Sequence, residues 1–197
     1  MSEARTKAGL ARTASHALGQ AAAASRSAAI AAAARLIRER TDAIVASNGH
    51  DMERSRRAGM PGPLLDRLML DAKRLDGIAS SLEEISRQDD PLGRVSWGRT
   101  LDSGVRVERV SVPMGVVAII YEARPNVTAD AFALCVRSGN ACVLKGGSAA
   151  RESCMALAAC CRDALVEAGL PADAVQYVDD DAEHTQTSEL VHATGLV

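Results

Sequence analysis

The second half of the chain alternates between short apolar runs and amphipathic stretches, and this alternation restricts the fold more than any other feature. The apolar runs are "GVVAII" (115–120), "ACVLK" (141–145) and "AVQYV" (174–178), and helical patterns follow them at 127–140, 149–169 and 183–195. Continuous apolar runs of this length are typical of strands that are covered on both faces. We therefore expect an α/β fold: an open, mostly parallel sheet with right-handed crossovers and helices on both faces.

The residues before this unit carry a helical pattern. Ile30, Ile37 and Ile44 fall seven residues apart, with alanines in the same stripe and charged residues facing away. Asn48-Gly49 is a good stop for this helix, and the polar segment 50–59 is interpreted as a short helix or turn. Helical spacing resumes after "MPGP" (60–63). We expect a helical segment over 1–90.

A different periodicity separates these two parts. Within 94–112, Val105, Val107 and Val110 alternate with charged residues, and "LDSG" (101–104) supplies a turn. This pattern predicts a β-hairpin over 94–112, and its charged outer face indicates that it projects from the body. The expected organisation is one domain, with the helical segment, the hairpin and a βαβαβα unit over 113–197.

Composition excludes several classes of partner. The chain is 47% hydrophobic and 24% charged, with a net charge of −2, so we expect a globular protein that binds neither nucleic acid nor an anionic membrane. No apolar run approaches the ~20 residues that span a bilayer. Residues 1–20 lack the apolar region of a secretory signal. They faintly resemble a transit peptide, but an amphipathic helix is the favoured interpretation.

The cysteines and histidines indicate neither a disulfide framework nor a metal. The five cysteines lie within predicted helices and strands, without a CxxC pair, and their number is odd. Buried free thiols in a reducing cytosol fit this pattern, so we expect a cytoplasmic protein. The four histidines have no ligand spacing, and no metal site is predicted.

Two polar segments follow predicted strands, where ligands bind in open α/β sheets. One of them, "KGGS", follows the predicted strand 141–145 and comprises Lys145, Gly146, Gly147 and Ser148. Its glycines would let a ligand approach the backbone, and the following helix N-terminus would favour an anion. The alternative is a glycine turn with a solvated lysine. Neither GxGxxG nor GxxxxGK[ST] is present.

The first polar segment is "YEARPNVT" (121–128). Asn126 has two interpretations: it could cap the following helix, or its amide could donate to an oxyanion that develops during a reaction. Arg124 is either a surface charge or a clamp for an anion. The residues alone leave both alternatives open.

The segment 112–150, "VPMGVVAIIYEARPNVTADAFALCVRSGNACVLKGGSAA", resembles the signature region of the γ-glutamyl phosphate reductases, also called glutamate-5-semialdehyde dehydrogenases. These enzymes are members of the aldehyde dehydrogenase superfamily. The segments 66–95 and 169–180 fit the same family in order. The resemblance implies an aldehyde-dehydrogenase-like cofactor-binding domain. It also implies NADPH-dependent reduction of L-glutamyl 5-phosphate to L-glutamate 5-semialdehyde in proline biosynthesis, through a thioester on a cysteine.

The resemblance also implies roles for particular residues. Asn126 would help to hold the oxyanion, and Arg124 would face the substrate's phosphate or carboxylate. Lys145 would contact the adenosine ribose or its phosphate, with Gly146 and Gly147 in the same loop. Ser148 replaces a glutamate of NAD-using relatives, which favours NADP(H) because no carboxylate would repel a 2′-phosphate. Ala149 stands where the family tends to have an acid. Homo-oligomers could form through the 94–112 hairpin.

One difference from the family enzymes limits the function that we expect of these residues. The family enzymes are much longer, and their nucleophilic cysteine lies in a second domain that these 197 residues do not match. We therefore expect a partial NADP-binding domain, with the catalytic domain absent, that is inactive alone. One alternative is a non-catalytic fragment for nucleotide binding or subunit association. Another is a different NADP-dependent acyl-phosphate or acyl-thioester reductase.

Overall fold

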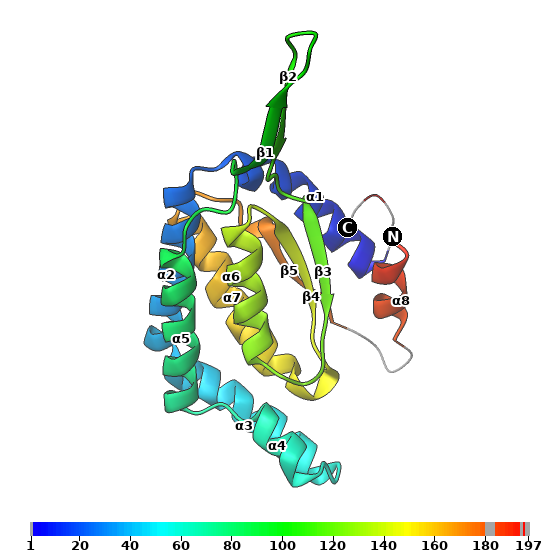
Figure 1. The fold of residues 1–197 in the computed structure, drawn as a ribbon. Coiled ribbons are helices and arrows are strands. Elements are labelled where there is room, and N and C mark those ends of the chain that lie inside the picture. Colours follow the sequence, from blue (N-terminus) through cyan, green and yellow to red (C-terminus); the bar gives the residue numbers. More distant parts are fainter. Residues whose placement is uncertain (1, 180–183, 194, 196–197) are drawn as a thin grey trace.

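The computed structural model describes residues 2–179, 184–193 and 195, and its centre is a parallel sheet (Figure 1). The sheet contains β3 (Val116–Ile120), β4 (Ala141–Lys145) and β5 (Val175–Tyr177), in that spatial order. Both strand pairs are parallel, from Val116 opposite Ala141 to Leu144 opposite Tyr177. The predicted parallel α/β sheet is therefore confirmed, and β4 is buried along its whole length.

Helices cover both faces of this sheet, as expected. On one face lie α6 (Asn126–Arg137) and α7 (Arg151–Glu167), which are the crossovers between the strands. On the other face lie α1 (Glu3–Gln20) and α8 (Thr185–Val191). Two short 3-10 helices, η1 (Ser148–Ala150) and η2 (Ala172–Ala174), precede α7 and β5.

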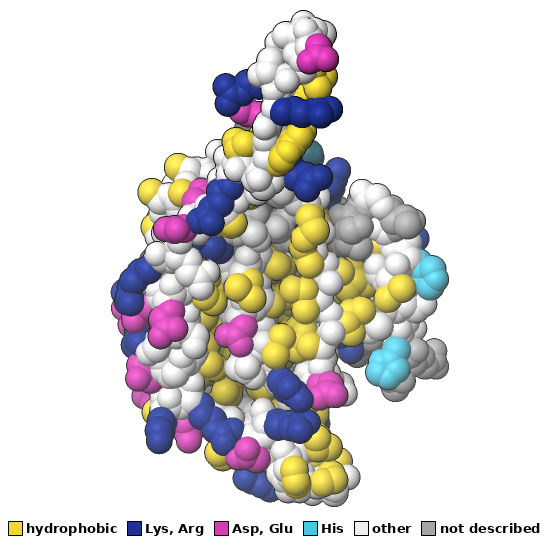
Figure 2. Space-filling view, viewed as in Figure 1, with side chains coloured by type: hydrophobic (Ala, Val, Ile, Leu, Met, Phe, Trp, Pro, Cys, Tyr) yellow, Lys and Arg dark blue, Asp and Glu magenta, His cyan; other side chains and the backbone are white. Residues whose placement is uncertain are grey.

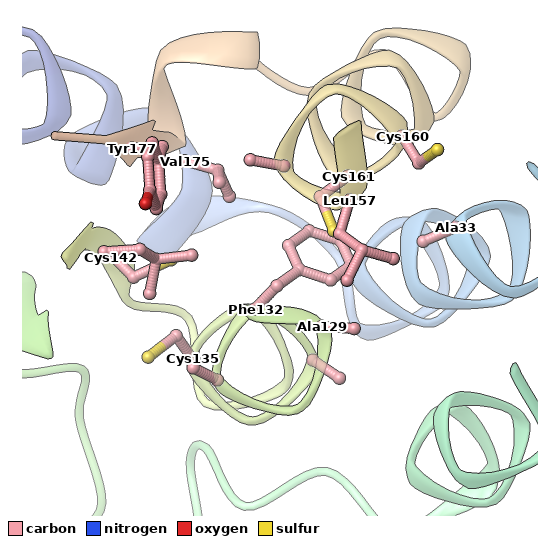
Figure 3. Packing of buried hydrophobic residues seen from close by; sticks show 14 of the residues in the cluster. Ala33, Ala129, Phe132, Cys135, Cys142, Leu157, Cys160, Cys161, Val175 and Tyr177 are labelled. Atoms are coloured by element: carbon pink, nitrogen blue, oxygen red, sulfur yellow. The ribbon is translucent and has the colours of Figure 1, made fainter. Parts of the chain in front are cut away.

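A further layer of helices packs outside α6 and α7. It consists of α2 (Ala23–Glu39), α3 (Thr41–Arg57), α4 (Gly62–Leu68) and α5 (Ala72–Arg87). The predicted stripe of Ile30, Ile37 and Ile44 is buried. Figure 3 shows Phe132 of α6 beside Leu157 and Cys161 of α7, with Ala33 of α2 close by. Small alanine side chains let these helices approach closely, which explains a core that holds few aromatic residues.

The predicted helix stop at Asn48-Gly49 is wrong. The chain breaks at Arg40, between α2 and α3, and α3 continues through Gly49 to Arg57. The Asn48 amide donates to the Leu68 carbonyl (2.8 Å) and to Ser153 Oγ (3.0 Å), and its oxygen accepts from the Leu70 amide (2.8 Å). These buried tertiary bonds outweigh the local preference of Asn-Gly for a helix end.

The predicted hairpin is present and extends away from the body (Figure 1). It pairs β1 (Val95–Thr100) with β2 (Arg106–Val110) in antiparallel register, and both strands are exposed along their length. Gly104 closes the turn with a φ of 84°, a conformation that favours glycine. Among the described residues, no helix has the length and apolar character needed to cross a membrane.

Candidate active site

The two polar segments that follow β3 and β4 lie in direct contact. The Tyr121 amide donates to the Lys145 carbonyl (3.0 Å). A Cβ atom on Gly147 would stand 2.8 Å from the backbone nitrogen of Ala123, and one on Gly146 would stand 3.2 Å from the Tyr121 ring. Real Cβ atoms do not approach backbone this closely, so Gly147 is required for packing between the loops.

Part of the polar character of "YEARPNVT" serves this packing. The Tyr121 hydroxyl and the fully buried Thr128 hydroxyl share a hydrogen bond of 2.7 Å. Burial raises the pKa of Tyr121, so the phenol stays neutral. Tyr121 and Thr128 therefore hold the loop in place, whereas Glu122 and Arg124 remain exposed.

Asn126 does not cap a helix. It is the first residue of α6, Pro125 occupies the cap position, and no side chain caps this end. The Asn126 side-chain amide donates instead to Asp130 Oδ2, one turn along the helix (3.1 Å). Burial raises the pKa of Asp130, and the bond from Asn126 opposes that shift. Asp130 thus fixes which way the Asn126 amide points.

Asn126 and Arg124 line one hollow with two further arginines. This arginine hollow, of about 450 Å³, is formed by Asp66, Arg67, Arg74, Arg124 and Asn126. Sequence reasoning found Arg124 and Asn126 but missed Arg67 and Arg74, which come from α4 and the first turn of α5. Arg74 is fixed, because it pairs with the Asp66 carboxylate (2.6 Å) and donates to the Met69 carbonyl (3.1 Å).

Ser148 lines a different hollow, of about 300 Å³, together with Arg54, Ser55, Ala58, Met60 and Ala149. A third hollow, of about 240 Å³, shares Met60 with this one and shares Arg67 and Arg124 with the arginine hollow. The three hollows therefore adjoin. They form what we call the carboxyl-edge groove, which runs past the ends of β3 and β4 from Ser148 to Asn126. Figure 2 shows Lys and Arg side chains gathered on the lower part of the molecule.

Lys145 lies at the end of β4 and is only 5% exposed, so the alternative of a solvated lysine is wrong. Gly146 is buried behind it, and Ser148 is exposed at the start of η1. The structure thus brings the Lys145–Ser148 loop against the loop that carries Arg124 and Asn126. It places Ser148 and Asn126 at opposite ends of the groove.

The N-terminus of α7 is already satisfied by a carboxylate of the protein. Asp51 is fully buried, and its Oδ2 accepts from the Ser153 amide (2.8 Å) and the Ser153 hydroxyl (2.7 Å). Its Oδ1 accepts from the Glu152 amide (3.3 Å) and pairs with Arg54. Sequence analysis missed Asp51. Because its charge occupies the positive end of α7, that end does not supply the anion site that "KGGS" suggested.

None of the five cysteines lines the three hollows, although Cys154 packs behind the Lys145–Ser148 loop, against Gly146. All five are free and buried, as predicted. Burial raises the pKa of Cys154, Cys160 and Cys161. The contact between Cys135 and Cys142 raises the pKa of Cys142 and lowers that of Cys135. Buried thiols of this kind are inert. Within the described residues, no three His, Cys, Asp or Glu side chains gather to hold a metal ion.

Comparison with known proteins identifies the family. Residues 2–195 match the model of the aldehyde dehydrogenase family. The chain belongs to this family. Aldehyde dehydrogenases use nicotinamide cofactors.

The resemblance to γ-glutamyl phosphate reductases is confirmed. The chain is 50% identical to the γ-glutamyl phosphate reductase of Caulobacter vibrioides over 153 residues, which is 78% of this chain and 37% of the relative. It is 42% identical to that of Xanthomonas campestris pv. campestris over 186 residues, 94% of this chain and 45% of the relative. The chain therefore spans less than half the length of these relatives.

Solved structures of the same enzyme share the fold. The crystal structure of γ-glutamyl phosphate reductase from Thermotoga maritima has a TM-score of 0.90 at 34% identity, covering 96% of this chain and 46% of that one. The Saccharomyces cerevisiae enzyme has a TM-score of 0.87 at 28% identity, covering 93% and 48%. The expected aldehyde-dehydrogenase-like fold is thus confirmed.

Proposed function

We propose that residues 1–197 form the nucleotide-binding part of a γ-glutamyl phosphate reductase, which uses NADPH to reduce L-glutamyl 5-phosphate to L-glutamate 5-semialdehyde in proline biosynthesis. The observation that carries this proposal is the carboxyl-edge groove. Three adjoining hollows lead from Ser148 to Asn126 and Arg124, in a chain whose relatives bear this enzyme's name. These relatives also favour it over a different acyl-phosphate or acyl-thioester reductase.

The proposed chemistry divides the groove between substrate and cofactor. A cysteine thiolate from outside these residues displaces phosphate and forms a thioester, and NADPH supplies the hydride that reduces it. The Asn126 amide donates to the oxygen that becomes negative as the carbonyl is attacked. Arg124 faces an anionic group of the substrate. Each role uses a side chain that lines the arginine hollow.

The residues near Ser148 fit a cofactor that carries a 2′-phosphate. Ser148 is neutral and exposed, and it lines its hollow with Arg54, whose charge is shared with Asp51 and Glu152. Lys145 is held at the end of β4, and the glycines that follow it allow close contact with the loop after β3. A phosphate would meet no carboxylate from Ser148, which favours NADP(H) over NAD(H).

The exposed hairpin supports a second, non-catalytic role. Val95, Trp97 and Val110 are each more than 40% exposed on strands that contact little of the body, a composition suited to contact between subunits. We infer that 94–112 takes part in homo-oligomers. With its thiols buried, the 197-residue polypeptide alone would serve only nucleotide binding and subunit association. A cytoplasmic location remains a prediction from its free thiols.

The purified 197-residue polypeptide is expected to show no reduction of NADP⁺ when glutamate 5-semialdehyde and phosphate are supplied. Without an accessible thiol, no thioester forms and no hydride is released. The measurement is absorbance of NADPH, beside a complete γ-glutamyl phosphate reductase as the positive control. Activity of the polypeptide that disappears when one of its own cysteines is changed to alanine would contradict the proposal.

Replacing Ser148 by glutamate is expected to lower the ratio of NADPH affinity to NADH affinity by roughly tenfold, equal to about 1.4 kcal/mol, because a carboxylate would repel the 2′-phosphate. Titration of both nucleotides by fluorescence measures the ratio. Ser148→Ala is the matched control and should leave it unchanged. Lys145→Ala should weaken both nucleotides. An unchanged ratio for Ser148→Glu would remove Ser148 from the cofactor site.

A further inference from the structure

Three arginines line the arginine hollow, whereas the sequence predicted only one arginine that binds an anion, Arg124. Its lining contains the guanidinium groups of Arg67, Arg74 and Arg124, against the single carboxylate of Asp66. That carboxylate is committed to Arg74, at 2.6 Å. The charges of Arg67 and Arg124 are left for another anion. Planar guanidinium groups bind phosphate and carboxylate oxygens through paired hydrogen bonds.

Glu122 is the carboxylate that lies beside both of these arginines. Its carboxylate lies 3.4 Å from the Arg124 guanidinium and 4.0 Å from that of Arg67, so it stands beside both. The Glu122 side chain is 73% exposed. Exposed ion pairs at these distances hold a side chain weakly, so an incoming anion can displace this carboxylate at little cost.

The position of Asn126 distinguishes the two anionic groups of the proposed substrate, and this step rests on the proposed function. Asn126 lines the same hollow as the arginines, and its amide is assigned to the oxygen on the reacting carbon. The phosphoryl group is bonded directly to that carbon. The α-carboxylate lies at the far end of the glutamyl chain. The anion beside Asn126 is therefore the phosphoryl group.

We propose that Arg67 and Arg124 together bind the phosphoryl group of the acyl phosphate, and that Glu122 occupies its place until the substrate arrives. When sulfur bonds to the acyl carbon, the carbon–oxygen bond to phosphate breaks and phosphate leaves with the electron pair. The guanidinium groups offset the negative charge that gathers on its oxygens. In reverse, a phosphate oxygen attacks the thioester carbon, and the thiolate leaves.

The reverse reaction tests this proposal because inorganic phosphate and the semialdehyde are then separate substrates. In a full-length γ-glutamyl phosphate reductase that carries these residues, Arg67→Gln is expected to raise the KM for phosphate about tenfold or more, and to leave the KM for the semialdehyde unchanged. Arg124→Gln should do the same. Glu122→Gln should lower the KM for phosphate, because the competing carboxylate is gone. The matched control is Arg87→Gln, on α5 but 71% exposed and outside the hollow, which should change neither KM.

Two results would overturn the assignment. A raised KM for the semialdehyde with an unchanged KM for phosphate would give the hollow to the α-carboxylate. Unchanged values for both substrates in the Arg67 and Arg124 variants would remove these arginines from the site. A failure of the proposed function would give a different result. The unaltered enzyme would then not reduce NADP⁺ when phosphate is added together with the semialdehyde.

Discussion

Replacing Asn126 by alanine in a full-length enzyme with these residues is expected to lower kcat by roughly a hundredfold or more, with little change in NADPH affinity. The lost amide donates mainly to the transition state, and removal of one such donor typically costs ~2.7–4 kcal/mol of barrier. Asn126→Asp should be at least as damaging, because a carboxylate repels the oxyanion. Steady-state kinetics and a nucleotide titration on the same preparations measure both effects.

The hydrogen bond between Asn126 and Asp130 offers a second role for Asn126, which is structural and predicts a different result for Asn126→Ala. If that bond only stabilises the first turn of α6, Asn126→Ala will lower the free energy of unfolding by about 1 kcal/mol and leave kcat unchanged. Thermal unfolding of the variant separates this outcome from the catalytic one.

Asp51→Ala is expected to lower the free energy of unfolding by about 3 kcal/mol or more. The buried carboxylate accepts from two backbone amides and one hydroxyl at the start of α7 and pairs with Arg54. Its removal leaves these donors unsatisfied in a site that water does not reach. Because α7 follows the Lys145–Ser148 loop directly, nucleotide affinity should fall as well. Denaturant unfolding gives the first quantity and titration gives the second.

A neighbouring acid on the same helix provides the control for Asp51. Glu53 is exposed and pairs with Arg57 one turn along, so Glu53→Ala should change stability by less than about 0.5 kcal/mol. Asp51→Asn, which keeps one acceptor oxygen, should lie between the two. Equal stability of Asp51→Ala and Glu53→Ala would show that α7 does not depend on Asp51.

The sheet was predictable because its signal is local. Each strand is a continuous apolar run, and each is followed by a helical pattern, so the parallel direction of the strands follows from rules of chain connection. The hairpin was equally local, since alternating valines flank a turn sequence. The loops at the ends of β3 and β4 could be assigned to the site for the same reason.

The misinterpreted helix shows where local rules failed. Asn48-Gly49 favours a helix end, but Asn48 forms buried bonds with Leu68, Leu70 and Ser153 that lie far along the chain. The helical spacing of buried residues continues beyond Gly49 and would have predicted the longer helix. Ile44, Asn48, Asp51 and Ser55 fall at helical spacing and are all buried, so the polar residues continue the apolar stripe.

The arginine hollow could be predicted only in part. Arg124 stands beside Asn126 in the sequence, within a segment that resembles a known signature. Arg67 and Arg74 belong to two other elements, α4 and α5, and only the folded chain brings them to the same hollow. Their local context resembles that of any surface arginine on a helix.

The placement of α1 has a consequence for the order in which this chain folds. Lys7 donates to the Tyr177 carbonyl across 170 positions of sequence, and the Ala4 amide donates to Gln186 across 182. A helix near the start of these residues thus packs on strands from their second half. During synthesis, the buried alanines of α1 lack the sheet face that covers them until β3, β4 and β5 have emerged. Contacts between residues so far apart in the sequence form slowly, and until they form the apolar face of α1 is exposed to wrong partners.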